Sequence, residues 1–241
     1  MIQFFVSSTF RDMHYERDII NSVILPQLKH IANDCGENIS LTDLRWGIDT
    51  QNIDPVEGMR KILSVCMQEI EFSFPHLIIM IGDRYGSVPD SRMIDDFLRS
   101  PGGSDFKYEE TVGKSITELE IIHAIEHLAS SYEGNLSACF TIVLRDPIDH
   151  TFMSNDSKSH YLAASSEESI QVKKLKERLE SLYPSAVIHY TAKWDSESDC
   201  PVGFEEFIRK LVQRLIRNQI TRMSSYFTEN MAAVQACMHL Q

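Results

Sequence analysis

The sequence lacks any apolar run that approaches the roughly 20 residues needed to span a bilayer. Its 5 cysteines are scattered without a C-x-x-C pair, which argues against a zinc site or a dithiol redox motif. No secretory signal pattern precedes the first apolar segment, and an odd number of separated cysteines is typical of a reducing compartment. We therefore expect a cytoplasmic protein with no membrane partner.

Basic charge is also scarce. Lys and Arg number 23 against 35 Asp and Glu, so the formal net charge is −12. Because a phosphate backbone is bound by a basic surface, we do not expect nucleic acid as a direct partner. A small nucleotide needs only a local site and is compatible with this charge. The hydrophobic fraction of 43% is typical of a domain that buries a core.

The common catalytic signatures are missing as well. The chain contains no G-x-x-x-x-G-K-[ST], G-x-G-x-x-G, H-E-x-x-H or G-x-S-x-G motif. Its 9 histidines show no spacing suited to metal ligands. We therefore predict no metal site and no resident cofactor, and any chemistry must come from ordinary side chains.

Apolar segments of strand length alternate with longer segments of helical periodicity over residues 1–220. This alternation predicts a three-layer α/β fold, flavodoxin-like in topology, with a five-stranded, mainly parallel sheet and helices on both faces. Residues 221–241 are expected to be a linker, or a helix leading into a further domain. The expected strands are 2–6, 39–44, 75–81, 138–144 and 186–190, and the expected helices are 10–33, 54–73, 115–125, 167–182 and 204–220, with a long loop and one short helix in 87–114.

The end of the first strand is the first candidate ligand site. Ser7, Ser8 and Thr9 follow the apolar run, and a helix is expected from Thr9 or Phe10, with Asp12 completing a capping box. A helix N-terminus at a strand end gathers unpaired N–H groups, which suits a phosphate. Alternatively, the three hydroxyl groups only cap the helix and close a turn. Arg11 is a further candidate at this edge, whereas Glu16 and Arg17 are expected on a solvated, salt-bridged face.

The ends of the next strands add charged and aromatic groups, and carboxyl ends of parallel strands share one edge of a sheet. Trp46 either stacks on a ring of the ligand or plugs the sheet edge. Arg45 pairs either with a phosphate or with Asp43. The third strand is followed by a glycine-flanked turn that permits close approach of a ligand, and its candidate ligand residues are Asp83, Arg84 and Tyr85.

A carboxylate at the same edge could perform chemistry. Ser115 and Glu118 form a second capping box, so Glu118 falls in the first turn of its helix. A carboxylate beside a ribose can stabilise oxocarbenium charge or attack the anomeric carbon. Glu118 is therefore the candidate catalytic residue, unless it only caps its own helix. Glu120 is the alternative and is expected to point elsewhere.

The order of these motifs resembles a known family. The chain reads F-V-S-S-T-F-R-D-M, then E-R-D, D-L-R-W-G-I, I-G-D-R-Y-G and S-I-T-E-L-E-I. This series is similar to the uncharacterised N-terminal domain of large STAND NTPases, carried by telomerase-associated protein 1, nephrocystin-3 and bacterial anti-phage relatives. The third motif usually begins with Glu where this chain has Asp83.

The resemblance implies a TIR-like fold, related also to nucleoside deoxyribosyltransferases. In those relatives a Glu in the helix after the central strand acts on the N-glycosidic bond of NAD or nucleosides, and Glu118 matches it, with Glu120 as the alternative. The implied function is an effector for anti-phage defence that cleaves NAD or a related nucleotide as its substrate. Self-association through an attached STAND NTPase would activate it. Because many TIR relatives are inert adaptors, a non-enzymatic signalling module is the alternative.

Overall fold

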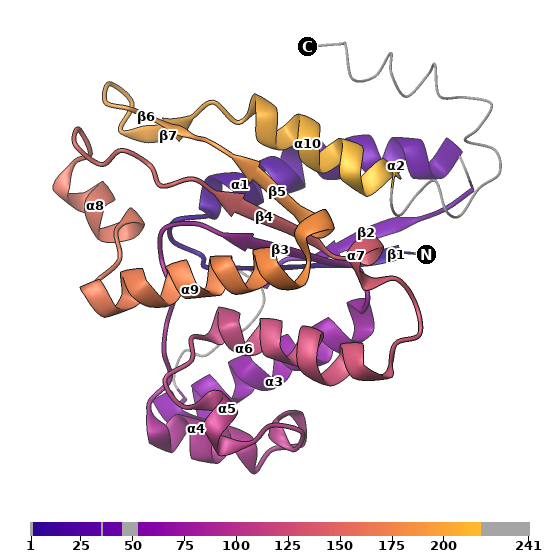
Figure 1. Cartoon of the computed structure of the whole chain (residues 1–241), viewed down its shortest axis with the longest axis vertical. Helices are drawn as coiled ribbons and strands as arrows, with labels where there is room; N and C mark the ends of the chain where they lie inside the picture. The colour runs from indigo at the N-terminus through magenta and orange to yellow at the C-terminus, as the bar shows by residue number, and fades with distance from the viewer. Residues whose placement is uncertain (1, 35, 45–52, 218–241) are drawn as a thin grey trace.

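The computed structural model describes residues 2–34, 36–44 and 53–217, which form a three-layer α/β fold (Figure 1). All neighbouring strands of its central sheet are parallel, in the order β2-β1-β3-β4-β5. This is the strand order of flavodoxin-like folds, so the predicted fold class is confirmed. The strands are β1 (Ile2–Ser8), β2 (Ile39–Thr42), β3 (Leu77–Ile81), β4 (Thr141–Arg145) and β5 (Val187–Tyr190).

Each face of the sheet has its own apolar core, because successive side chains of a strand point to opposite faces. Phe4 and Val6 pack into one core and Phe5 into the other. Strands buried on both faces explain the nearly continuous apolar runs of the sequence. One face is covered by α1 (His14–Ile19), α2 (Leu25–Asp34) and α10 (Glu205–Leu215), and the other by α3 (Pro55–Ser73), α6 (Ile116–Ile122) and α9 (Ser166–Leu182) (Figure 1).

The first helix begins later than predicted. It starts at His14 rather than at Thr9 or Phe10, because the carboxylate of Asp12 binds backbone N–H groups of the chain after β3 instead of capping its own helix. A π-helical turn, Ile20–Ile24, then separates α1 from α2. Pro26 lacks the N–H group that a regular α-helix needs at this point, which accounts for the change of helical register.

Two helices start where the sequence predicts. The side chain of Asp54 accepts hydrogen bonds from Val56 and Glu57 at the start of α3. Ser115 accepts one from the backbone N–H of Glu118 at the start of α6. The helical path continues after α6 as a π-helical stretch, His123–Leu128, and a 3₁₀ turn, Ala129–Ser131.

The segment 87–114, predicted as a long loop with one short helix, holds two helices and packs against the core. Ile94, Phe97 and Phe106 belong to the same apolar core as α3. The sequence also missed a short helix in a polar stretch, an antiparallel hairpin of two strands, and the helix Leu136–Cys139, which takes up the start of the predicted strand 138–144, so that β4 begins at Thr141. These elements are α4 (Ser91–Leu98), a 3₁₀ turn (Pro101–Gly103), α5 (Tyr108–Thr111), α7 (Leu136–Cys139), α8 (Asn155–Tyr161), a 3₁₀ turn (Pro184–Ala186), β6 (Lys193–Asp195) and β7 (Cys200–Val202).

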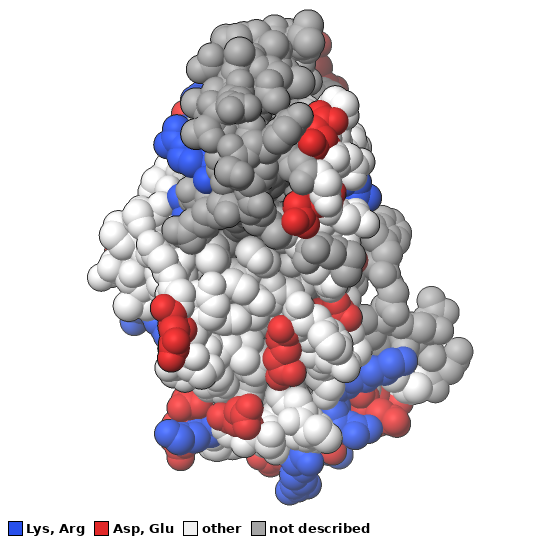
Figure 2. Space-filling view, turned by 90° about the vertical axis from the view of Figure 1, so that its right-hand side faces the viewer, with Lys and Arg blue, Asp and Glu red and all other residues white. Residues whose placement is uncertain are grey.

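Residues 221–241, predicted to lead into a further domain, lie outside the described residues. Within the described ranges, no helix is both long and apolar enough to cross a membrane. On the side of the molecule shown in Figure 2, Asp and Glu side chains stand in the middle of the face, while Lys and Arg lie toward its margins. Among the described residues on this side, that arrangement forms no basic stripe for a nucleic-acid backbone.

Candidate functional site

A pocket of about 430 Å³ opens at the carboxyl end of β1, between the segment after that strand, α3 and α6. In a flavodoxin-like sheet this is a topological switch point, where the chain leaves β1 for β2 on one side and β3 lies on the other. Ligands of open α/β sheets bind at such a point. Its lining includes Thr9, Phe10, Arg11, Cys66, Arg84 and Glu120.

Glu120 supplies the carboxylate of this pocket. Ser7 Oγ donates a hydrogen bond to Glu120 Oε2 at 2.5 Å, and the thiol of Cys66 lies against the same carboxylate. Burial raises the pKa of Glu120, while the bonds from Ser7 and Cys66 and the charge of Arg17 oppose this rise. Burial also raises the pKa of the Cys66 thiol. The pocket wall therefore holds a desolvated carboxylate in a fixed orientation.

Glu118 does not line the pocket. Its carboxylate accepts a hydrogen bond from the Tyr85 hydroxyl, lies 2.8 Å from Lys114 Nζ and 3.6 Å from an Arg178 nitrogen. Residues two apart on a helix are rotated by about 200°, so Glu118 and Glu120 point in nearly opposite directions. The expectation that Glu120 points away from the candidate site was wrong, because Glu120 lies in the pocket wall and Glu118 on the opposite side of α6.

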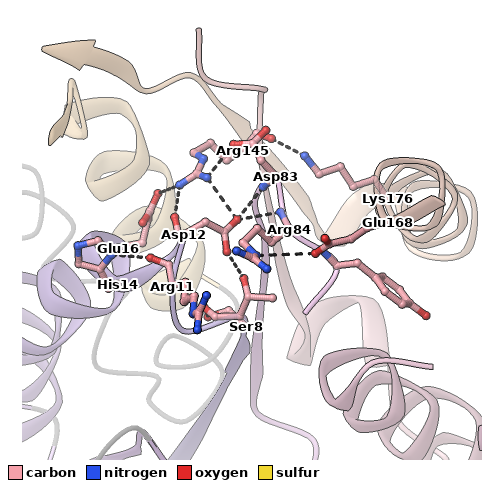
Figure 3. Close-up of polar contacts among 12 residues, drawn as sticks. Ser8, Arg11, Asp12, His14, Glu16, Asp83, Arg84, Arg145, Glu168 and Lys176 are labelled. Atoms are coloured by element: carbon pink, nitrogen blue, oxygen red, sulfur yellow. Dashed lines mark hydrogen bonds and ion pairs between the residues drawn. The ribbon is translucent and has the colours of Figure 1, made fainter. Parts of the chain in front are cut away.

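Arg145, at the end of β4, is the centre of a buried ionic network (Figure 3). It donates to Glu16 at 2.7 Å, to Asp83 at 2.8 Å and to the backbone oxygen of Asp12 at 2.6 Å. Burial lowers the pKa of Arg145, but the neighbouring carboxylates outweigh this effect and raise it overall. Burial raises the pKa of Asp83. Asp83 is thus bound to protein rather than presented to a ligand.

Asp12 ties the segment after β1 to the segment after β3. Its Oδ2 atom accepts hydrogen bonds from the backbone N–H groups of Asp83 (2.7 Å) and Arg84 (3.0 Å), as Figure 3 shows. Thr9 donates its hydroxyl hydrogen bond to the other oxygen of Asp12. The Thr9 side chain therefore lies at the pocket wall. Its hydroxyl proton is already used in the hydrogen bond to Asp12.

Arg17 forms a second buried centre. It donates to Ser8 Oγ at 2.7 Å and to Asp43 Oδ1 at 2.6 Å, and it also contacts two backbone oxygens of β1. Glu16 and Arg17 were expected on a solvated face, and both are buried. The expectation was wrong because each has a partner far away in sequence: Glu16 binds Arg145 and Arg17 binds Asp43.

Arg11 is the cation of the pocket whose charge is uncompensated. Its side chain is exposed, and no ion pair or side-chain hydrogen bond involves it within the described ranges. Arg84 also lines the pocket, but it donates to the backbone oxygen of Ser159 at 2.7 Å and lies 3.7 Å from Glu168. Arg11 is therefore the cation best placed to meet a phosphate.

Phe10 was missed by the sequence analysis. Its ring lines the pocket and is 51% exposed, unusual for a phenylalanine beside a buried strand. The Arg17 guanidinium lies 4.8 Å from the centre of this ring, so the ring is held in place from one side. An exposed aromatic ring that is already positioned can stack on a base.

The predicted site residues thus separate into groups. Ser8, Thr9, Arg11, Arg84 and the alternative Glu120 lie at the pocket, with Ser7 directly behind Glu120. Four others, Asp43, Asp83, Tyr85 and Glu118, have side chains bound to other protein groups. Arg45 and Trp46 lie outside the described residues. Among the residues that the structure describes, no three His, Cys, Asp or Glu side chains converge in a way that could hold a metal ion.

Gly82 is a place where the network leaves no room for a side chain. A Cβ atom there would lie 2.7 Å from Arg145 Nη2 and from Met13 Sδ, and closer still to the Asp12 carboxylate. We expect Gly82→Ala to reduce the free energy of unfolding by about 1–3 kcal/mol, because overpacking displaces buried partners. Urea unfolding measures this change.

Gly113→Ala is the matched control for Gly82→Ala. Apart from Gly113 and its two chain neighbours, no described residue has an atom within 4 Å of the added Cβ. The positive φ of 73° opposes the substitution, at a cost of about 1 kcal/mol. An equal loss in both variants would show that steric conflict at the network is not the cause.

Fold and pocket together define a flavodoxin-like α/β domain with a ligand-sized pocket at its switch point, walled by one buried carboxylate and one unpaired arginine. Residues 3–132 match the family model "Domain of unknown function (DUF4062)", and the chain belongs to that family. The match covers β1 through α6 and so includes every element that lines the pocket.

Curated relatives are much longer proteins. The chain is 29% identical over 215 residues to Telomerase protein component 1 of Mus musculus, and 28% identical over 217 residues to that of Rattus norvegicus. These alignments cover 88% of this chain but 8% of each relative. A TPR repeat-containing protein of Dictyostelium discoideum is 26% identical over 185 residues, covering 74% of this chain and 10% of the relative. No solved structure matches the chain significantly.

Proposed function

We propose that this chain is an effector domain that binds NAD or a related nucleotide and hydrolyses its N-glycosidic bond, with Glu120 as the catalytic carboxylate. The observation that carries this proposal is a buried carboxylate, held by Ser7, in the wall of a pocket that also contains an unpaired arginine. No metal or resident cofactor is part of the mechanism, and the nucleotide is the substrate.

The proposed reaction needs only one carboxylate and water. The bond between the anomeric carbon and the nicotinamide nitrogen breaks, and its electron pair leaves with nicotinamide. The carboxylate of Glu120 stabilises the oxocarbenium charge on the ribose, as carboxylates do in glycoside cleavage. Water then adds to the anomeric carbon and releases a proton, so the products are nicotinamide and ADP-ribose. Burial of the carboxylate strengthens its attraction for the developing positive charge.

The other pocket residues suit the rest of a nucleotide. Arg11 offers an uncompensated positive charge for a phosphate. Phe10 offers an exposed ring for a base or the nicotinamide. Glu118 has no role in the reaction, since it connects α6 to Tyr85, Lys114 and Arg178.

We infer that the domain, residues 1–220, belongs to a longer STAND-type ATPase, with residues 221–241 as the linker or helix that leads to a further domain. In such a protein, self-association of the ATPase would bring effector domains together and switch on cleavage in anti-phage defence. The chain aligns with 8% of the length of each mammalian relative, which supports a small domain within a large protein. Activation by assembly would keep a nucleotide-consuming enzyme silent until its trigger arrives.

A second candidate is a non-enzymatic signalling module that uses the same edge for self-association or partner docking. It is favoured by the internal pairing of Asp43, Asp83 and Tyr85, which removes three predicted ligand groups from the surface. In that case the Arg145 and Arg17 networks serve only to fix the shape of the edge.

The test is to incubate the full-length, assembled protein with NAD and to follow nicotinamide and ADP-ribose by chromatography. If the domain hydrolyses NAD, nicotinamide and ADP-ribose should form in equal amounts. If the assembled protein releases no nicotinamide, and Glu120→Gln leaves the biological activity unchanged, the signalling module is the correct function.

Ser7→Ala tests the orientation of the carboxylate. Loss of the hydrogen bond from Ser7 Oγ removes an interaction that lowers the pKa of Glu120, so this pKa should rise further. The carboxylate must be ionised for catalysis. On acidification, the variant should therefore lose activity at a higher pH than the wild type does. The pH profile of kcat/KM measures this shift. Ser100→Ala is the control, because the buried Ser100 Oγ donates to the backbone oxygen of Phe97 and does not contact Glu120, so an identical shift there would contradict the assignment.

A further inference from the structure

A second pocket, of about 440 Å³, lies at the opposite edge of the sheet. Residues on α10 line one side, and residues that precede β4 and β5 line the other. It shares no lining residue with the pocket at the carboxyl end of β1. Its polar lining includes Asn135, Ser137, Ser185, Lys210, Arg214 and Arg217.

The lining is basic in a protein of net charge −12. Lys210, Arg214 and Arg217 are spaced by four and three residues, which puts them on one face of a helical path. Among the described residues that line it there is no Asp or Glu. Three cations around one hollow favour a local positive potential, even though Glu206 pairs with Lys210.

Among the described residues, Arg214 bonds only to backbone oxygens. It donates to the backbone oxygens of Ser185 (2.7 Å), Ser137 (2.6 Å) and Phe140 (2.8 Å). No carboxylate pairs with it in the described part of the chain, and its Nε atom is buried there without a hydrogen-bond acceptor. Burial lowers the pKa of Arg214, and no nearby negative charge compensates. A partly desolvated cation of this kind gains from an anionic partner.

Lys210 can donate one further hydrogen bond. Its Nζ atom lies 2.8 Å from Glu206 and donates to the backbone oxygen of His189 at 2.7 Å. An ammonium group has three N–H donors, so one is left for a ligand. The hydroxyl groups of Ser137 and Ser185 and the amide of Asn135 add neutral donors to the same hollow.

We propose that this pocket binds a phosphate group. A phosphate with a charge between about −1.5 and −2 matches several cations better than a carboxylate does, and its oxygens accept from arginine, lysine and hydroxyl donors alike. The phosphate would connect α10 to the residues that precede β4 and β5, and so brace this edge of the sheet. The site does not depend on the proposed hydrolysis of NAD, because it uses different residues.

The test is a titration of the full chain with inorganic phosphate at constant ionic strength, followed by the NMR signals of backbone amides. Saturable shifts are expected at residues 185–188 and 210–215, whereas any shifts at residues 8–11 report on the other pocket. Parallel titrations with AMP and with a phosphoserine peptide distinguish a free nucleotide from a phosphorylated protein as the source. AMP shifts at residues 8–11 report on the other pocket, so the two proposals can fail separately.

Lys210→Met should weaken phosphate binding by about fivefold or more, corresponding to about 1 kcal/mol. Lys173→Met is the control, because Lys173 also forms an i,i+4 ion pair with a glutamate, Glu177 on α9, but does not line this pocket, so this variant should leave the affinity unchanged. The absence of saturable shifts in the wild type would overturn the proposal. Equal affinity in wild type and Lys210→Met would overturn it as well.

Discussion

Glu120→Gln is expected to lower the rate of nicotinamide release from NAD by about 100-fold or more, the range for loss of a positioned catalytic group. Glutamine has nearly the same shape but carries no charge, so it cannot stabilise an oxocarbenium ion. The amide can still accept the hydrogen bond from Ser7 and should fold normally. Product release by the assembled protein under saturating NAD measures the rate, and urea unfolding confirms that the variant is folded.

Glu118→Gln is the matched control on the same helix. It loses the ion pairs with Lys114 and Arg178 and weakens the contact with Tyr85, so its stability should fall. The folded variant should nevertheless retain most of the wild-type rate, because Glu118 does not line the pocket. The reverse result, a silent Glu118→Gln and an active Glu120→Gln, would assign catalysis to Glu118 and refute the assignment made from the pocket.

Arg145→Met is expected to cost about 3–5 kcal/mol of unfolding free energy, as measured when one partner of a buried ion pair is removed. The substitution leaves Asp12, Glu16 and Asp83 close together and buried without their common cation. The side chains of Asp12 and Glu16 are 0% exposed, so water cannot replace the lost charge without opening the structure. Urea or thermal unfolding at neutral pH measures the loss.

The pH dependence of this loss gives a second test. Without Arg145, burial should raise the pKa of Asp83 above its already raised value. A carboxyl whose folded-state pKa is raised stabilises the fold below its unfolded pKa and loses that contribution as the pH rises through the folded pKa. The deficit of Arg145→Met should therefore shrink as the solution is acidified from neutral pH.

Arg60→Met is the control for the loss of an arginine ion pair. Arg60 Nε lies 3.0 Å from Asp96, with both side chains about 40% exposed. Exposed pairs contribute about 0–1 kcal/mol, so this variant should unfold nearly like the wild type. If Arg145→Met were equally mild, the network would not be what fixes this edge of the sheet.

The sheet could be predicted because its signals are local. Each strand contains an apolar run short enough to read directly, and the main helices show their own periodicity, with a side-chain cap at α3 (Asp54) and α6 (Ser115). The start of α1 could not be read in this way. The position of Asp12 after Thr9 is typical of a capping box. In the structure its carboxylate instead accepts hydrogen bonds from two backbone N–H groups after β3. The polar helix α8 and the hairpin of β6 and β7 were missed because their local patterns are weak.

The sequence by itself determined that charged, hydroxyl and aromatic groups gather at the carboxyl edge of a parallel sheet. Tertiary structure alone decided which of them are bound by protein and which face the pocket. Arg145 meets Glu16 across 129 residues and Arg17 meets Asp43 across 26. No local pattern encodes such pairing, because it depends on how β4, β2 and α1 are brought together. The same reason separates Glu118 from Glu120, since neighbouring elements decide which side of α6 faces the pocket.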